Sequence, residues 1–370
     1  VYDGTFQNSE PHGGGRMIYK DCRVCEGIWK NGKIEYEGEL LDGLPHGRGK
    51  WIYPNGSVYE GEWKVGMWHG KGKWTYSHGT YEGEFRDGLR HGKGRHIFSH
   101  GTYEGEWKNG ERHGQGSFKW TDGSSYEGEW KEDKRHGKGI DKYSDGSVEY
   151  EGEWKDGKRH GQGRYKSNDR EIYEGGWRDG LMHGRGKLIF LDVGAYYEGE
   201  FKEDKMHGKG IIKHPDGSII YDGEWKDDEP DGYGTCNHLN GDVYTGEWRA
   251  GMRHGKGVKT YANPDIFDGE WKEHLKDGKG MIKFHNGDVY TGEFSKDKIH
   301  GKGTYEYSDG DVLKSIGEWK EGKKCGLFED IVRVTVAKQV YYDNDELVLE
   351  SNVTREAALD EDTDSDDAAS

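Results

Sequence analysis

The sequence is poor in the residues from which most globular domains build their cores. Proline contributes 6 of 370 residues and cysteine 4, and leucine, isoleucine and valine are scarce. So few cysteines exclude a disulfide scaffold. The one CxxC pair, Cys22 and Cys25, supplies only two of the four ligands of a structural zinc site. A thick aliphatic core, a disulfide framework and a metal centre are therefore not expected.

Long apolar runs are also missing. A transmembrane helix needs about 18 to 20 consecutive apolar residues, and no segment approaches that length. No signal peptide is recognisable. A reducing, cytoplasmic setting is therefore expected. The first residue is Val1 rather than methionine, so the sequence can be part of a longer chain.

Glycine and aromatic residues are abundant instead. Glycine contributes 63 residues without a Gly-X-Y period, which excludes collagen, and 13% of the residues are aromatic, too many for a disordered chain. Much glycine together with much tryptophan and tyrosine favours a thin β-structure in which rings pack on bare backbone.

A short motif recurs along the chain. The block Tyr59-Glu60-Gly61-Glu62-Trp63 is followed by His69-Gly70-Lys71-Gly72, whose histidine stands ten residues after the tyrosine. The chain holds fourteen full copies in all, typically 22 to 25 residues apart, and a stunted copy at residues 25–29 begins 11 residues before Tyr36. Such self-similarity is typical of repeat arrays. Positions in the repeat are counted from the tyrosine, which is position 0.

Each copy predicts a β-hairpin with two unlike faces. Neighbouring residues of a strand point to opposite sides, so Tyr, Gly and Trp at positions 0, 2 and 4 share one face, and the charged residues at positions 1, 3 and 5 share the other. Pairs such as Asn55-Gly56 and Asp156-Gly157 mark tight turns. The predicted fold class is all-β: an elongated, twisted, single-layer antiparallel β-hairpin repeat array with one solvated face.

The motif Tyr-Glu-Gly-Glu-Trp-Lys-x-Gly-x-x-His-Gly-x-Gly resembles the MORN (membrane occupation and recognition nexus) repeat over residues 2 to about 326. The resemblance implies a curved ribbon. Such repeats occur in radial spoke heads of cilia, in protist cytoskeletal scaffolds, in junction proteins that link membranes, and beside some lipid kinase and lysine methyltransferase domains. Because the sequence shows no room for either enzyme domain, it resembles the all-repeat members, which are cytoskeletal or axonemal scaffolds.

Departures from the motif suggest regional boundaries. The stunted copy lacks a His-Gly block, so a break in register or a bend is expected there, and the last copy has Ser315 in place of its tyrosine. Residues 341–370 hold eleven acidic residues against Arg355 alone. We therefore predict a repeat array over residues 1–326, capping strands over 327–342, and an acidic tail over 343–370 that is flexible or bound to a partner.

No pattern in the sequence indicates catalysis. A catalytic group would not be copied along an array, so the histidines at position 10 are expected to be structural, and so are the charged pairs such as Glu153 and Lys155 on the solvated face. The phosphate-loop string GxxxxGK[ST] and the motifs GxSxG and HExxH are missing. We therefore predict no enzyme, no cofactor and no bound metal.

Basic residues recur at positions 8 and 9, in the turn between the two strands of a copy. These turns would lie along one edge and form a basic ridge for an acidic partner: phosphoinositide headgroups, a tubulin tail or another protomer's acidic part. The alternative is that acids at position 6, such as Asp87 and Asp156, cancel this charge. The predicted edge comprises Arg90, Arg112, Lys134, Arg135, Lys158, Arg159, Lys205, Arg253 and Lys298.

These observations predict a non-catalytic structural scaffold or protein-interaction module in a cytoskeletal assembly, with a ciliary or flagellar axoneme as the first expectation. Expected partners are proteins of that assembly, with homodimerisation or a neighbour covering the aromatic face. The alternatives are a membrane-associated adaptor for acidic phospholipids and a targeting arm of a longer enzyme. Of the net charge of −17, −10 lies in residues 341–370 and −7 in the rest, which argues against a nucleic-acid partner.

Overall fold

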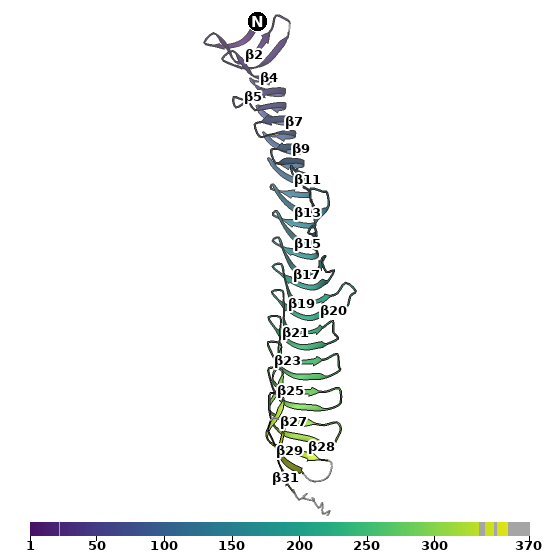
Figure 1. Ribbon diagram of the computed structural model, residues 1–370. Coiled ribbons are helices and arrows are strands. Elements are labelled where there is room, and N and C mark those ends of the chain that lie inside the picture. The colour runs from purple at the N-terminus through teal and green to yellow at the C-terminus, as the bar shows by residue number, and fades with distance from the viewer. Residues whose placement is uncertain (22, 333–336, 344–345, 354–370) are drawn as a thin grey trace, which may run out of the picture. The chain divides into compact units, whose positions relative to one another are not determined.

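The computed structural model describes residues 1–21, 23–332, 337–343 and 346–353. These residues form β-strands, turns and bends, and no helix occurs among them, so none of the described segments could cross a membrane as a helix. The chain divides into two compact units, one of residues 1–194 with 201–204 and the other of residues 195–200 with 205–370. Within each unit, successive strands follow one another as rungs (Figure 1). The all-β hairpin prediction is confirmed.

The first unit is a single antiparallel sheet in which each strand pairs with the strands before and after it. Its strands are β1 (Tyr2–Gln7), β2 (Glu10–Ile18), β3 (Val24–Lys30), β4 (Lys33–Leu41), β5 (Leu44–Ile52), β6 (Val58–Lys64), β7 (Met67–Tyr76), β8 (Gly79–Arg86), β9 (Leu89–Phe98), β10 (Gly101–Lys108), β11 (Glu111–Trp120), β12 (Ser125–Lys131), β13 (Lys134–Lys142), β14 (Val148–Lys155), β15 (Lys158–Lys166), β16 (Glu171–Arg178) and β17 (Leu181–Phe190).

The second unit repeats the same order from β19 onward. The residues of β18 (Tyr196–Lys202) are divided between the units. The other strands are β19 (Lys205–Lys213), β20 (Ile219–Lys226), β21 (Glu229–Asn237), β22 (Val243–Arg249), β23 (Met252–Thr260), β24 (Ile266–Lys272), β25 (Leu275–Lys283), β26 (Val289–Ser295), β27 (Lys298–Glu306), β28 (Val312–Lys320), β29 (Lys323–Val332), β30 (Ala337–Asp343) and β31 (Glu346–Val353).

The β10–β11 hairpin shows how one repeat is built. Its turn residues, Asn109 and Gly110, have φ angles of +53° and +91°, the left-handed pair that a tight hairpin turn requires. Tyr103 stands opposite Phe118, and the register then shifts beyond Gly105. The shift is a β-bulge, and it leaves two residues of β11 without a ladder partner in β10.

A glutamate holds this bulge in place. Gly114 lies in the bulge with φ +57°, a conformation that favours glycine, and the Glu106 carboxylate accepts a 3.2 Å hydrogen bond from the freed Gln115 backbone N–H. The equivalent bond recurs at Glu129 and Glu153, each at 2.9 Å. The position-3 glutamates therefore have a structural role in addition to their place on the solvated face.

The aromatic face forms the core. Tyr103 is fully buried, its ring lies edge-on to Trp107 in its own copy at 5.1 Å and to Trp130 in the next copy at 5.3 Å, and its hydroxyl donates a 3.0 Å hydrogen bond to the Glu106 carbonyl. Edge-on ring pairs contribute about 0.5–1.5 kcal/mol each beyond their buried area. The other position-0 tyrosines with no exposed area are Tyr36, Tyr59, Tyr81, Tyr126, Tyr150, Tyr173, Tyr197, Tyr244 and Tyr290.

Glycine and tryptophan join one copy to the next. A Cβ on Gly116 would clash with the Tyr103 ring, so the ring can lie flat on the backbone only where glycine stands. The Trp130 indole then donates a 3.1 Å hydrogen bond to the Gly116 carbonyl of the preceding copy. Because each repeat completes the packing of its neighbour, its stability depends on that neighbour.

The stunted copy reverses the faces of the sheet. It contributes only β3, so β4 serves both as the partner of β3 and as the first strand of the next copy. In this ladder Tyr36 stands opposite Ile28, whose side chain points away from the face that holds Trp29. Tyr36 consequently packs on Trp63 (5.4 Å), whereas Trp29 packs on Tyr2 (5.6 Å).

The surroundings of Cys25 agree with this reversal. Burial and the nearby Glu37 carboxylate raise the pKa of the Cys25 thiol to about 11. Cys25 occupies position 0 of its copy, whereas Glu37 occupies position 1, on the charged face, of the next copy. The break expected at the stunted copy is therefore an exchange of the aromatic and charged faces, caused by the missing second strand.

Strands extend further toward the C-terminus than the sequence predicts. β30 pairs with β29 and β31 pairs with β30, although β31 lies within the segment expected to be an acidic tail. The run Leu347-Val348-Leu349 is apolar, but the prediction of a tail was based on the net charge of residues 341–370, which does not show this run. The remainder of the predicted tail, residues 354–370, lies outside the described residues.

Candidate interaction surfaces

The predicted basic edge follows the turns between positions 5 and 9. Neighbouring turns are joined directly: the Gly110 backbone N–H donates to the Arg90 carbonyl at 2.9 Å, and that of Gly157 donates to the Arg135 carbonyl at 2.9 Å. The structure thus places the predicted residues of the first unit on consecutive turns. It separates positions 8 and 9, however, because neighbouring residues of a strand point to opposite faces.

The position-9 arginines lie on the aromatic face. Each guanidinium is stacked over the tryptophan of the following copy, a cation–π contact of about 0.5–2 kcal/mol. The distances from the guanidinium carbon to the ring centroid are 4.3 Å for Arg90 on Trp107, 4.3 Å for Arg112 on Trp130, 4.1 Å for Arg135 on Trp154, 5.4 Å for Arg159 on Trp177 and 4.6 Å for Arg253 on Trp271.

Carboxylates neutralise three of these arginines within the chain. Arg112 contacts Asp133 at 2.9 Å, Arg135 contacts Asp141 at 2.6 Å, and Arg159 contacts Glu149 at 2.6 Å. The arginine side chains keep only 22%, 30% and 21% of their surface exposed. They therefore hold neighbouring repeats together and offer little charge to an outside partner.

The position-8 lysines point to the opposite face and remain exposed. Lys134 and Lys158 are exposed, and neither makes an ion pair within the described residues. In the second unit, 52% of the Lys205 side chain is exposed beside Asp227 (3.8 Å), and 56% of the Lys298 side chain is exposed beside Glu321. Of the predicted edge, the lysines are the residues available to a partner.

Arg90 has a buried histidine as its partner, which the sequence analysis missed. His96, 2% exposed, accepts a 2.7 Å hydrogen bond at Nδ1 from Arg90, and its Nε2 lies 2.9 Å from the Tyr76 hydroxyl. Because arginine can only donate, Nδ1 carries no proton and Nε2 donates to Tyr76. Burial, Arg90 and Arg112 lower the pKa of His96 to about 4.

The position-10 histidines face the next repeat. Nδ1 of His160 lies 3.4 Å from the backbone N–H of Asp179, and Nδ1 of His46 lies 3.4 Å from that of Val65. Where aspartate replaces the histidine, Asp231 accepts the same bond from Ala250 at 3.0 Å. In these copies histidine and aspartate share the acceptor role, whereas Nδ1 of His12, His69, His91, His136 and His207 accepts no hydrogen bond within the described residues.

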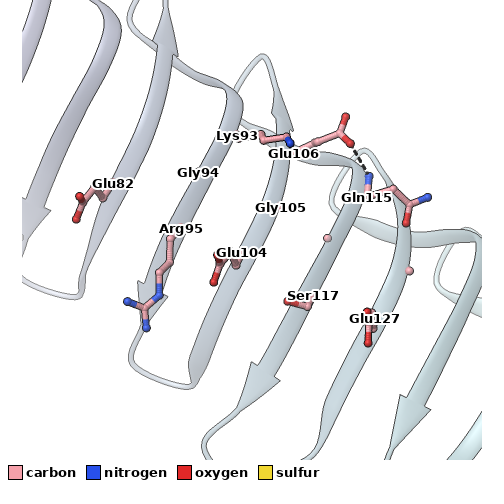
Figure 2. Close-up of a pocket in the computed structure, with 12 residues that line it drawn as sticks. Glu82, Lys93, Gly94, Arg95, Glu104, Gly105, Glu106, Gln115, Ser117 and Glu127 are labelled. Atoms are coloured by element: carbon pink, nitrogen blue, oxygen red, sulfur yellow. Dashed lines mark hydrogen bonds between the residues drawn. The ribbon is translucent and has the colours of Figure 1, made fainter.

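The charged face carries an open groove. In the first unit Gly94 and Gly105 lie among its lining residues (Figure 2). One side is formed by positions 1 and 14, here called the 1/14 row, which includes Glu104 and Arg95. The other side is formed by positions 3 and 12, here called the 3/12 row, which includes Glu106. Both sides of the groove are charged here.

The chain belongs to the MORN-repeat family. Fifteen segments match the MORN repeat: residues 2–21, 25–35, 36–58, 59–80, 81–102, 103–125, 126–148, 150–171, 173–192, 197–219, 221–243, 244–263, 267–289, 290–312 and 316–327. The stunted copy is among them. Membership indicates a module that binds proteins or membranes.

Other comparisons add no functional argument. No curated protein matches the sequence. Similar solved structures include the TCP10 domain of Danio rerio CPAP in complex with a peptide of Danio rerio STIL (11% identity, 85% of this chain and 97% of that chain, TM-score 0.20). A streptogramin B lyase (9%, 53% and 84%, TM-score 0.14) and BamB from Moraxella catarrhalis (11%, 78% and 99%, TM-score 0.14) also match. With TM-scores this low, none of the three carries an argument here.

Proposed function

We propose that this protein is a non-catalytic structural scaffold in a cytoskeletal assembly, with a ciliary or flagellar axoneme as its site. The proposal rests on the different roles of the repeat positions: some hold neighbouring copies together, and others remain exposed. Tyrosines, tryptophans and glycines hold the copies to one another, joined by arginines in the copies that carry them at position 9. Lysines at position 8, in the copies that carry them, and the charged 3/12 row lie on the exposed side. A surface repeated in this way suits the bridging of several partners.

The proposal is tested by expressing the tagged protein in a ciliated or flagellated cell and extracting the cell with detergent. A scaffold remains on the extracted axoneme or cytoskeleton. Release of the protein together with membrane would contradict the proposal.

A membrane-associated adaptor is the second candidate. Exposed lysines such as Lys134 and Lys158 could contact acidic phospholipids, at about 1 kcal/mol per residue near an anionic surface. Vesicles containing phosphatidylserine test this candidate. It predicts salt-sensitive binding that is lost in the variant Lys134→Glu/Lys158→Glu, and equal binding of wild type and variant would exclude these two lysines as the contact. Arginine reversals are unsuitable because the arginines pack within the fold.

A further inference from the structure

The groove on the charged face differs between the two units. In the first unit, the 1/14 row is charged on ten of twelve consecutive strands, and basic and acidic residues face each other across most strand pairs. In order from β6 to β17, it reads Glu60, Lys73, Glu82, Arg95, Glu104, Ser117, Glu127, Ile140, Glu151, Arg164, Glu174 and Lys187.

In the second unit the same row loses its charge. From β21 to β28 it reads Thr235, Thr245, Val258, Asp268, Met281, Thr291, Thr304 and Ile316, each facing the next across the ladder. Aspartate is the one charged residue of these eight. Val258, Met281 and Ile316 are 37%, 40% and 38% exposed, so the row presents apolar surface to solvent.

The row beside it widens this surface. Position −1 carries Val243, Ile266 and Val289, all half-buried, on β22, β24 and β26. Thr260 stands between the first two in the ladder and Lys283 between the last two, and Glu306 and Lys314 continue this row on β27 and β28. The apolar and threonine-rich band therefore follows the 1/14 row across eight strands of the second unit, and it is wider from β22 to β24, where Val243, Thr260 and Ile266 are neighbours.

The opposite side of the groove stays charged. The 3/12 row alternates in sign along the unit, with Lys256 facing Glu270 and Lys279 facing Glu293 across the ladders. A hollow lies between the two sides, lined by Met281 and Thr291 from one and by these lysines and glutamates from the other. The groove is therefore apolar along one side and charged, with both signs, along the other.

We infer that this groove, residues of β21–β28, binds an amphipathic α-helix of a partner protein, a proposal that rests on the function proposed above and specifies its partner chemistry. A helix with an apolar stripe and a flank of alternating acidic and basic residues matches both sides. Its turns repeat every ~5.4 Å, close to the ~4.8 Å between strands. Eight strands span roughly 34 Å, the length of about 22 helical residues.

Other occupants fit less well. A lipid surface needs net positive charge or a larger apolar area, and the 3/12 row is balanced. An extended peptide that adds a strand needs free backbone at a sheet edge, whereas these strands are paired on both sides. The mixed sides of the groove therefore favour the helix.

The test uses the full chain and a synthetic 22-residue peptide. Its leucines repeat at i, i+3/i+4 and i+7, and lysine and glutamate alternate along one flank. The variant Val258→Lys/Met281→Arg gives the second unit the residues that occupy the same repeat position at Lys73 and Arg95, so the fold tolerates them. Ser117→Lys introduces one charge of the same sign in the 1/14 row of the first unit and is the control for a basic residue at this position outside β21–β28.

Fluorescence anisotropy should show saturable binding to the wild type and to Ser117→Lys, and at least tenfold weaker binding to Val258→Lys/Met281→Arg. Hydrogen exchange should place the protection on β21–β28. Three results would overturn the inference: no binding to the wild type, equal binding of the double variant or of a scrambled peptide, or a concentration-dependent dimer that the double variant abolishes. If the peptide fails while the protein stays on the detergent-extracted cytoskeleton, the helix site is wrong and the scaffold function stands.

Discussion

Protonation of His96 is expected to loosen the first unit in mild acid. The imidazole is enclosed by aromatic rings, with Tyr81 at 5.8 Å and Trp107 at 5.7 Å, and it faces the guanidiniums of Arg90 and Arg112. A proton on Nδ1 would remove the acceptor of the Arg90 hydrogen bond and place a third positive charge beside two others. The neutral ring is therefore required by the fold.

The size of the expected loss of stability follows from the difference in the pKa of His96 between the folded and unfolded states. The pKa of His96 is about 4 in the fold and 6.5 as its ordinary value, which is taken for the unfolded chain. The unfolded state consequently binds more protons between these values, so stability is complete above pH ~6.5, falls as the pH drops toward ~4, and levels off below. At ~1.4 kcal/mol per pKa unit, the loss is about 3 kcal/mol.

Hydrogen exchange of β9–β11, corrected for intrinsic rates, measures this loss between pH 7 and 4.5. The substitution His96→Phe reproduces the neighbouring copy, where Phe118 stands at the same position beside Arg112. It should flatten the pH dependence of protection in these strands, whereas His78→Asn, at an exposed histidine, should not. An unchanged pH dependence in His96→Phe would refute the reasoning.

Three further variants test which side chains the fold depends on. Gly116→Ala drives a methyl group into the Tyr103 ring and should cost more than 1 kcal/mol in urea unfolding; a smaller loss would mean that the ring does not need bare backbone. Trp130→Phe leaves a smaller aromatic ring, as Phe85 is at the same repeat position, and removes the 3.1 Å bond to the Gly116 carbonyl, so at least about 1 kcal/mol should be lost; no change would show that the bond is unimportant. Lys134→Glu/Lys158→Glu should leave the free energy of unfolding within about 0.5 kcal/mol of wild type, since both side chains are exposed; a larger loss would show that these lysines stabilise the fold.

Much of the fold could be predicted from the sequence because the same residues recur at a nearly constant spacing. The spacing of Tyr59 and Tyr81 and the glycines at fixed positions predicted the hairpins and the aromatic face. The alternation of side chains along a strand could also have separated Arg135 from Lys134. The two residues do not form one basic ridge, because Arg135 packs on Trp154 and Asp141 whereas Lys134 points to the opposite face.

Other features depend on register and burial, which no single copy reveals. His96 is an ordinary member of a charged stretch in the sequence, and only the ladder places it beside Arg90. The exchange of faces at Tyr36 arises because one strand is missing, and the motif itself does not show which strand replaces it. The change of the 1/14 row in the second unit is visible in the sequence once the ladder assigns Val258 and Met281 to one row.

Cross-linking of the detergent-extracted cytoskeleton tests the central claim most directly. A lysine-reactive reagent, followed by mass spectrometry, should join exposed lysines of this chain, including Lys134, Lys158 and Lys298, to cytoskeletal or axonemal proteins. That result is expected if the repeats hold themselves together and present their lysines outward. Cross-links confined to this chain, or loss of the protein with the membrane fraction, would contradict the account.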